Sequence, residues 1–421
     1  MLNLRRIVVR SERLIYRIAA LPIAFRAHFF RSPDMPALEL RRAVARRFWH
    51  AEALHEGAEL VAALLLWPVA LIGAMMWFTA RNGGMVSRRD GRPILAQCAD
   101  QLRLYFSAGI LAPWYYIFSL YDDGDSRAPT FLQRAETKWG VYLLLRPAAA
   151  SPLGKKKAFA DRCAEHGVRC VPDLLSLDPT DGPRSDLALP DRDLFVKPAR
   201  GRGGRGAERW DRVGPFQYKG PDDEALTDRT LIERLASRAR GMPLLVQPRL
   251  EPHSSLADLT AGALPTARLL TCLDERANPE VMAAVFRMSI GVNRTVDNIH
   301  AGGIACGIEL GSGMLGKASN LGSDARLGWL SRHPDTGAVI EGRSLPFWPE
   351  VKALAVLAHQ AFADRIMIGW DLAILEDGPI VIEGNGGPDM DLMQRFMRTG
   401  FCRHRFADLL TFHLRQRGLA A

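Results

Sequence analysis

Two acidic residues and an amide near the C-terminus have the types and the spacing to bind a metal ion. The apolar runs IMIGWDLAIL and PIVIEGN flank the tripeptide EDG, which predicts a β-hairpin with a three-residue loop and a left-handed glycine. This closure pairs Leu375 with Pro379 and places Asp371 opposite Glu383. Since side chains alternate along a strand, Asn385 shares the face of Glu383. Mg²⁺ binds carboxylates together with substrate phosphates, so we predict that Asp371, Glu383 and Asn385 form a metal site.

A glycine-rich loop in the middle of the chain has the composition of a phosphate-binding loop. The segment DLFVKP at 193–198 predicts a strand, and the following ARGRGGRG contains Gly203 and Gly204, whose backbone can approach a polyphosphate closely. Residues 208–210 predict a returning strand, so the loop is a hairpin tip toward which Lys197 reaches. A flexible tip and an RGG-type RNA segment are the alternatives, although RGG tracts normally repeat and this one occurs once. No long helix starts directly after the glycines, which excludes a dinucleotide fingerprint.

Three further patterns predict the elements around these residues. Residues 155–167 have a helical apolar side, and 168–171 predict a short strand. The segment GSGMLGKA at 311–318 approximates Walker A spacing but has alanine at the magnesium-binding position. We therefore interpret 309–315 as a hairpin turn.

Composition narrows the class of protein. The chain has 421 residues with 48% apolar and 24% charged residues, values that exclude a disordered, collagen-like or coiled-coil protein. The net charge of +9 rests on arginine and is weak support for nucleic-acid binding, so we expect no nucleic-acid partner. Six cysteines without a CxxC pair or zinc-type spacing favour a reduced, cytoplasmic location.

The first 121 residues predict contact with a membrane. Residues 1–50 contain eleven arginines and lack the apolar run of a signal peptide, so export is not expected. The arginines near helical spacing are typical of a basic amphipathic helix, at a membrane surface or with a solvated face: Arg6, Arg10, Arg13 and Arg17.

Two uncharged runs follow, at 60–80 and 104–121. The first is long enough to cross a bilayer, but one span with a cytoplasmic C-terminal part would place the eleven arginines outside, against the positive-inside tendency. Three alternatives stay open: a spanning hairpin with both ends in the cytoplasm, a surface-docked segment, or buried core helices.

Six segments in order resemble the ATP-grasp superfamily, and most closely its sugar-transfer-associated branch, which is related to alpha-L-glutamate ligases. The resemblance covers roughly residues 140–417 and rests on these segments: KKKAFADRCAEHGVRCVP, FVKPARGRGGRG, LLVQPRL, LPTARLLT, VFRMSIG with VDNIHAGGIACGI, and IGWDLAILEDGPIVIEGN. It implies an α+β fold in which two lobes clamp ATP. We expect a helical N-terminal region at 1–135, a nucleotide lobe at 136–250 and a metal-binding catalytic lobe at 251–421.

The resemblance also implies roles for single residues. Lys156 and Lys197 would contact phosphates, although Lys155 stands where relatives often have aspartate. Gln247 and the backbone of Leu250 would lie edge-on to adenine, and many relatives have glutamate at 247.

Further roles concern the reacting groups. Arg268 and Arg287 would approach the transferred phosphate and the substrate carboxylate as catalytic residues. The acceptor side, or a purely structural turn, would be formed by these residues: Asp297, Asn298, Gly302 and Gly303.

The implied reaction needs ATP and Mg²⁺, with Mn²⁺ as an alternative ion. A small-molecule, peptide or sugar carboxylate would attack the γ-phosphate, and an amine would capture the acyl phosphate as an amide. A phosphotransferase acting on a hydroxyl group and a non-catalytic nucleotide-binding module at a membrane assembly are the rival interpretations. The branch name suggests cell-surface polysaccharide or peptide modification. We expect the protein in the cytoplasm, with the cytoplasmic face of the inner membrane as the alternative location. Asp371→Asn and Glu383→Gln are expected to abolish turnover and leave the fold nearly intact.

Overall fold

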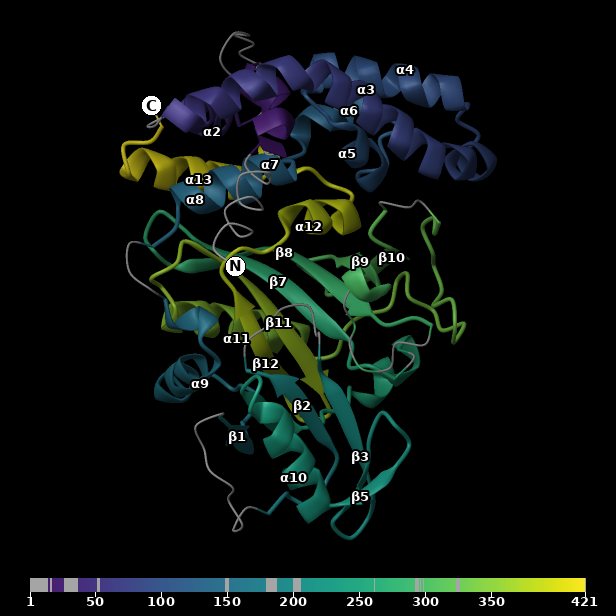
Figure 1. The fold of residues 1–421 in the computed structure, drawn as a ribbon, viewed down its shortest axis with the longest axis vertical. Coiled ribbons are helices and arrows are strands. Elements are labelled where there is room, and N and C mark those ends of the chain that lie inside the picture. The colour runs from purple at the N-terminus through teal and green to yellow at the C-terminus, as the bar shows by residue number, and fades with distance from the viewer. Residues whose placement is uncertain are drawn as a thin grey trace.

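A computed structural model gives two antiparallel sheets and a helical N-terminal region (Figure 1). It describes residues 14–15, 17–25, 37–50, 54–147, 151–178, 188–199, 206–260, 262–291, 295, 297, 299–322 and 326–420. The glycine-rich loop positions Gly203 and Gly204, as well as Asn298, lie outside these residues.

The C-terminal sheet has the strand order β10-β9-β8-β7-β11-β12, and all its neighbouring strands are antiparallel. Its strands are β7 (Thr266–Leu273), β8 (Pro279–Met288), β9 (Ile304–Ile308), β10 (Leu315–Ser319), β11 (Met367–Leu375) and β12 (Gly378–Asn385). The turn between β9 and β10 confirms the hairpin predicted at 309–315, where the Glu309 carboxylate accepts hydrogen bonds from the backbone N–H groups of Gly311 and Ser312.

The middle sheet has the order β1-β6-β2-β3-β4-β5. Its elements are β1 (Leu175–Leu177), β2 (Leu194–Pro198), β3 (Glu208–Gly214), β4 (Gln217–Lys219), β5 (Ala225–Thr227), β6 (Leu244–Pro248) and helix α10 (Asp228–Ala239). Helix α10 buries Leu231 and Leu235 against the sheet. The pairing of Leu194 with Trp210 confirms the predicted strand and returning strand on either side of the glycine-rich loop.

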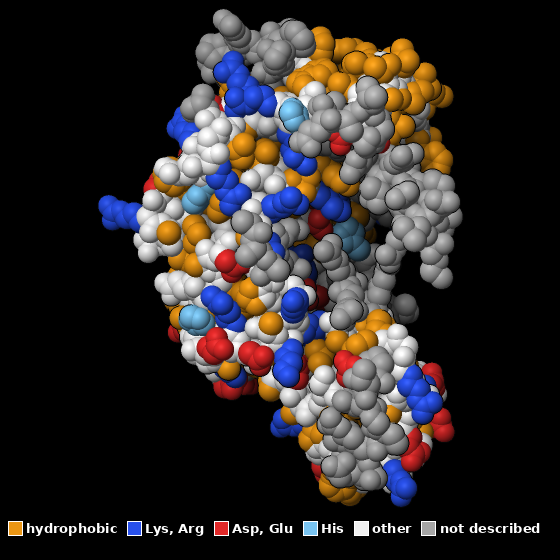
Figure 2. Space-filling view, turned by 60° about the vertical axis from the view of Figure 1, so that its left-hand side comes forward, with side chains coloured by type: hydrophobic (Ala, Val, Ile, Leu, Met, Phe, Trp, Pro, Cys, Tyr) orange, Lys and Arg blue, Asp and Glu red, His pale blue; other side chains and the backbone are white. Residues whose placement is uncertain are grey.

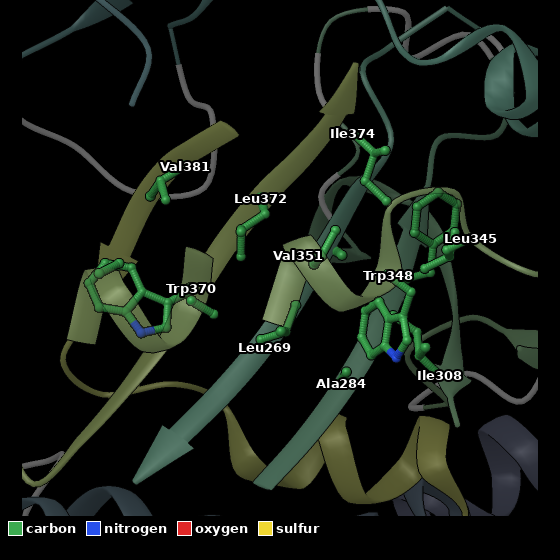
Figure 3. Packing of buried hydrophobic residues seen from close by; sticks show 14 of the residues in the cluster. Leu269, Ala284, Ile308, Leu345, Trp348, Val351, Trp370, Leu372, Ile374 and Val381 are labelled. Carbon is green, nitrogen blue, oxygen red and sulfur yellow. The ribbon is translucent and has the colours of Figure 1, made fainter. Parts of the chain in front are cut away.

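Alternation along β11 separates a core face from a polar face. Trp370, Leu372 and Ile374 pack with helix α11 (Trp348–Ala361), as the close view of this cluster shows (Figure 3). The opposite face of the same sheet is covered at one end by α12 (Met390–Met397) and α13 (Arg405–Gln416). Asp371 lies on that second face because it alternates with the core residues.

The β11–β12 hairpin confirms one prediction and corrects another. Asp371 does lie opposite Glu383, but Leu375 pairs with Gly378 rather than with Pro379. The loop is therefore one residue shorter than predicted, and a bulge next to Asp371 restores the register at the site. Gly378 has a φ of 110°, as the predicted positive-φ glycine requires.

The segment before the middle sheet was predicted partly correctly. Helix α9 (Lys156–Glu165) confirms the helix expected at 155–167. The strand predicted at 168–171 is wrong, because only Cys170 forms a bridge there, parallel to Val381 of β12. Phe159 anchors α9 by stacking on Phe362, with ring centroids 5.3 Å apart, so α9 docks on the C-terminal sheet.

The N-terminal region is helical, with α2 (Leu38–Trp49), α3 (Leu54–Asp90), α4 (Ile94–Ala108), α5 (Ala112–Ile117), α6 (Gly124–Arg127), α7 (Arg134–Glu136) and α8 (Tyr142–Leu144). The two uncharged runs differ in burial. Residues 104–121 break at Gly109, which has a φ of 72°, and most of them are buried in one cluster. The run at 60–80 lies in α3 and is largely exposed. Core helices thus explain the second run and not the first.

The N-terminal helices and the C-terminal sheet share one core. Leu40 and Val44 of α2 belong to the cluster that contains Leu270 and Leu410. Gln394 of α12 also bonds to the backbone of Leu132 in both directions, at 2.9 and 2.8 Å. The expected division of the chain into three domains, with boundaries near residues 135 and 250, stays a prediction. The shared core contains residues from both sides of the boundary near 135.

Candidate functional site

Four neighbouring strands place charged and polar side chains on one face of the C-terminal sheet. The cross-strand pairs are Thr266 with Arg287, Arg268 with Asp371, Asp371 with Glu383, and Gly369 with Asn385. Directly paired residues on adjacent antiparallel strands point to the same face. Residues that are far apart in the sequence therefore lie in neighbouring rows on one face of the sheet.

Asp371 is the centre of a buried ion-pair network. Its carboxylate receives two hydrogen bonds of 2.6 Å from Arg268, and a third of 3.1 Å from Arg287. Only 3% of Asp371 is exposed. Burial alone would raise the pKa of Asp371, but the two arginine charges outweigh it and hold that pKa at about 2. The carboxylate is therefore ionised at all ordinary pH values.

Arg287 is fixed by further partners. Its guanidinium donates to the Thr266 hydroxyl at 2.6 and 3.0 Å and to the Asp297 carboxylate at 3.2 and 3.3 Å. Thr266 in turn donates to Asp297. Asp297, which was considered for the acceptor side, is thus a buried partner of Arg287, and Gly302 occupies a turn with a φ of 99°.

Glu383 and Asn385 provide the exposed part of the predicted metal site. The Asn385 amide donates to Glu383 at 3.2 Å, which shows that the two side chains are neighbours. Glu383 is also the cross-strand partner of Asp371, so the two carboxyl groups lie on the same face of the sheet. Within the described residues, no group of three His, Cys, Asp or Glu side chains is arranged to hold a metal ion. The donor set fits Mg²⁺ only if phosphate oxygens complete the shell.

Two lysines from different parts of the chain meet at the border of the two sheets. Lys156 comes from the first turn of α9, and its ammonium donates to the carbonyl of Pro198, next to Lys197 on β2. Burial, and then the charge of Lys197, lowers the pKa of Lys156 to about 8. Burial also lowers the pKa of Lys197, while Glu383 and Asp173 oppose that change. Two desolvated ammonium groups together favour an anion between them.

The structure describes the two residues for which the family resemblance implies adenine contacts. Gln247 on β6 is buried, and its amide donates to Asp173 at 2.8 Å. Leu250 follows β6 and is half-buried. The sequence analysis did not predict a role for Asp173, because a single aspartate in a loop forms no recognisable motif. In the structure, its charge acts on both Lys156 and Lys197.

A second polar cluster was also missed. Asp389 lies 3.4 Å from Arg134 and 3.6 Å from His300, and its charge interacts with Arg268. Asp391, at the start of α12, is buried, and burial raises its pKa to about 6. The segment GGPDMD directly after Asn385 was the available signal. The sequence could not have indicated that Arg134 belongs to this cluster, because only the tertiary fold brings the N-terminal region close to Asp389.

A sequence profile described as sugar-transfer associated ATP-grasp matches residues 145–405. The chain belongs to this sugar-transfer associated ATP-grasp family. The membership confirms the family resemblance, and the two antiparallel sheets with a helical N-terminal region confirm the predicted α+β ATP-grasp fold. No protein with a curated description matches the chain.

Solved structures with some likeness to this ATP-grasp chain are ligases. A D-alanine–D-alanine ligase from Bacillus anthracis complexed with ATP has 10% identity and a TM-score of 0.33, covering 58% of each chain. An L-amino acid ligase from Bacillus licheniformis has 11% identity and a TM-score of 0.34, covering 61% of this chain and 48% of that one. The ATP-grasp ligase PsnB, complexed with a minimal precursor, Mg and ADP, has 14% identity and a TM-score of 0.33, covering 62% and 59%. At such TM-scores these structures inform no residue role.

Proposed function

We propose that this ATP-grasp protein is an ATP-dependent carboxylate–amine ligase. The observation that carries the proposal is the position of Glu383. Its charge acts on Lys156, on Lys197 and on Arg268, so one carboxylate links the lysine pair to the arginine–aspartate network. Phosphates held by the lysines would thus lie beside the arginines.

The residues support the charge changes of the first step. A substrate carboxylate oxygen attacks the γ-phosphorus, the bond to the ADP oxygen breaks, and an acyl phosphate forms. Lys156 and Lys197 would neutralise the phosphates, and Arg268 and Arg287, already fixed by Asp371, offer N–H groups without reorganisation. Glu383, Asn385 and Asp371 would hold Mg²⁺, which would supply positive charge to the phosphates.

In the second step an amine attacks the acyl carbon, phosphate leaves, and the nitrogen loses a proton to give an amide. We propose that the protein acts in the cytoplasm. Its substrates would be small-molecule, peptide or sugar carboxylates and an amine. We also propose a role in cell-surface polysaccharide or peptide modification, and the support for it is the association of the family with sugar transfer.

Hydroxylamine trapping tests the proposal. Purified protein with Mg-ATP is screened against pooled amino acids, uronic acids and small peptides, while ADP and hydroxamate are followed together. We expect substrate-dependent ADP with hydroxamate, and neither in Glu383→Gln. ADP with a phosphorylated hydroxyl product and no hydroxamate would show a phosphotransferase instead. Tight ATP binding without turnover on any pool would favour a non-catalytic nucleotide-binding module.

A further inference from the structure

The outer side of α3 is a wide apolar surface that the described residues leave uncovered. Only 11% of its most apolar 18-residue window is buried. Large apolar side chains with 40–74% of their area exposed recur along it: Val61, Leu64, Leu65, Leu66, Val69, Ile72, Met76 and Trp77. In Figure 2, hydrophobic side chains gather accordingly at one side of the end formed by the N-terminal helices.

Helix α4 extends this surface. Leu95 is 84% exposed and Phe106 is 65% exposed, and they lie at opposite ends of α4. Trp67 of α3 stacks on Tyr105 of α4 at 5.9 Å between ring centroids, so the two helices lie side by side. An apolar surface of this extent on a soluble domain usually marks a partner or a membrane.

The length of α3 would allow it to cross a bilayer, but its neighbour argues against crossing. Gln97 and Gln101 of α4 bond to Gly83 and Thr79 of α3, at 3.0 and 2.8 Å. Between those glutamines lies Asp100, which pairs with Arg103 at 3.0 Å.

The side chain of Arg103 is 44% exposed at the level of the apolar stretch. A spanning α3 would carry this ion pair into hydrocarbon, at a cost of several kcal/mol. A helix lying in the plane of the membrane avoids that cost, because only its outer side enters the lipid.

The charged residues around the surface favour an anionic lipid surface. Exposed arginines stand on α2 and on the second half of α3: Arg42, Arg46, Arg47, Arg81 and Arg88. Basic side chains at the edge of an apolar helix face are typical of interfacial helices, where they contact lipid headgroups while the apolar side enters one leaflet.

We propose that the α3–α4 pair docks the enzyme on one leaflet of an anionic membrane, with α3 lying in the membrane plane and not crossing it. The C-terminal sheet and the site lie on the inner side of these helices (Figure 1), so the docked protein keeps its ATP site in the aqueous phase. The geometry thus selects the surface-docked alternative for residues 60–80.

Vesicle flotation tests the docking. The full-length protein is mixed with phosphatidylcholine vesicles, with or without about 30% phosphatidylglycerol. The variant Leu65→Glu/Val69→Glu changes two side chains that are 72% and 74% exposed, so the fold is expected to survive. Val213→Glu on β3, at a site 52% exposed, is the matched control. We expect the unaltered protein to float with the anionic vesicles. The double variant should bind them at least about tenfold more weakly, and the control should bind like the unaltered protein.

Equal flotation of the unaltered protein and the double variant would overturn the proposal, as would no flotation at all. A stable dimer in detergent-free solution that the double variant dissociates would show that a second copy covers the surface. Thermal unfolding of the double variant, compared with the control, separates lost docking from lost folding.

Labelling with a membrane-impermeant maleimide distinguishes docking from crossing. Ala58→Cys and Arg88→Cys place thiols at exposed positions near the two ends of α3, and the unaltered protein gives the background from its own cysteines. If α3 lies in the plane, both positions react from the same side of sealed vesicles. Reaction from opposite sides would contradict the proposal.

Discussion

The two charged clusters of the site differ in how their charges are balanced. In the first, Asp371 lies between Arg268 and Arg287, and its oxygens accept three hydrogen bonds of 2.6 to 3.1 Å. In the second, the charge of Lys197 disfavours the charge of Lys156, and burial disfavours both charges. The first cluster is complete within the protein. In the second, the charges of Glu383 and Asp173 offset the burial of the lysines only in part, and a bound anion would supply the remaining counter-charge.

This difference indicates that the phosphates of the nucleotide bind at the lysine cluster. A buried ion pair with satisfied hydrogen bonds positions the groups that form it, and breaking it is costly. A desolvated cation pair costs stability in the free protein, and binding of a polyphosphate recovers that cost. We therefore expect substitutions in the first cluster to affect folding and activity together, and substitutions in the second to affect ligand binding with little loss of stability.

The largest effect should come from Asp371→Asn. Removing the charge leaves Arg268 without its counter-ion and takes one of two carboxylate partners from Arg287, which should lower the free energy of unfolding by about 3 kcal/mol. The low pKa of Asp371 means that its stabilisation is present at neutral pH and is lost as the pH falls toward 2. The ion-pair geometry thus leads us to expect a loss of stability, where the sequence alone led us to expect a nearly intact fold. Chemical denaturation at pH 7 and pH 3 measures both effects.

Glu383→Gln is the matched comparison within the same predicted metal site. Glu383 is exposed and bonds to Asn385, so the free energy of unfolding should change by less than about 0.5 kcal/mol. Magnesium-dependent turnover should still be lost. If Glu383→Gln unfolds as easily as Asp371→Asn, the assignment of separate structural and ligand-binding roles is wrong.

A smaller effect on stability, and of opposite sign, is expected at Lys197. Lys197→Met removes a desolvated ammonium and keeps an apolar stem of similar length, so the free protein should become more stable. The affinity for Mg-ATP should fall by about tenfold or more, because a charge-assisted contact to phosphate is lost. Calorimetry of ATP binding and thermal unfolding measure the two changes, with Lys219→Met on β4 as the control. Loss of stability without loss of affinity would contradict the phosphate role.

The sequence was sufficient to place side chains where the alternation of side chains along a β-strand applies. Asp371, Glu383 and Asn385 were placed on one face correctly, although the loop was one residue shorter than predicted, since a bulge compensated for the error. The arginines that pair with Asp371 lie about a hundred residues away on β7 and β8, and only strand order brings them together. The two uncharged runs could not be distinguished by composition either, because burial depends on what packs against each helix.

The most direct test of this contrast is the pKa of Lys156 with and without nucleotide. The chain has only eight lysines, so NMR of protein labelled at the lysine ε-position can follow each of them, with Lys156→Gln and Lys197→Met assigning two signals. In the free protein we predict a pKa of about 8 for Lys156. Bound Mg-ADP or Mg-ATP favours the charged ammonium and should raise that pKa by about one unit or more, so ATP affinity should fall as the pH rises above 8. An ordinary lysine pKa in the free protein, or a pKa that saturating nucleotide leaves unchanged, would contradict the account.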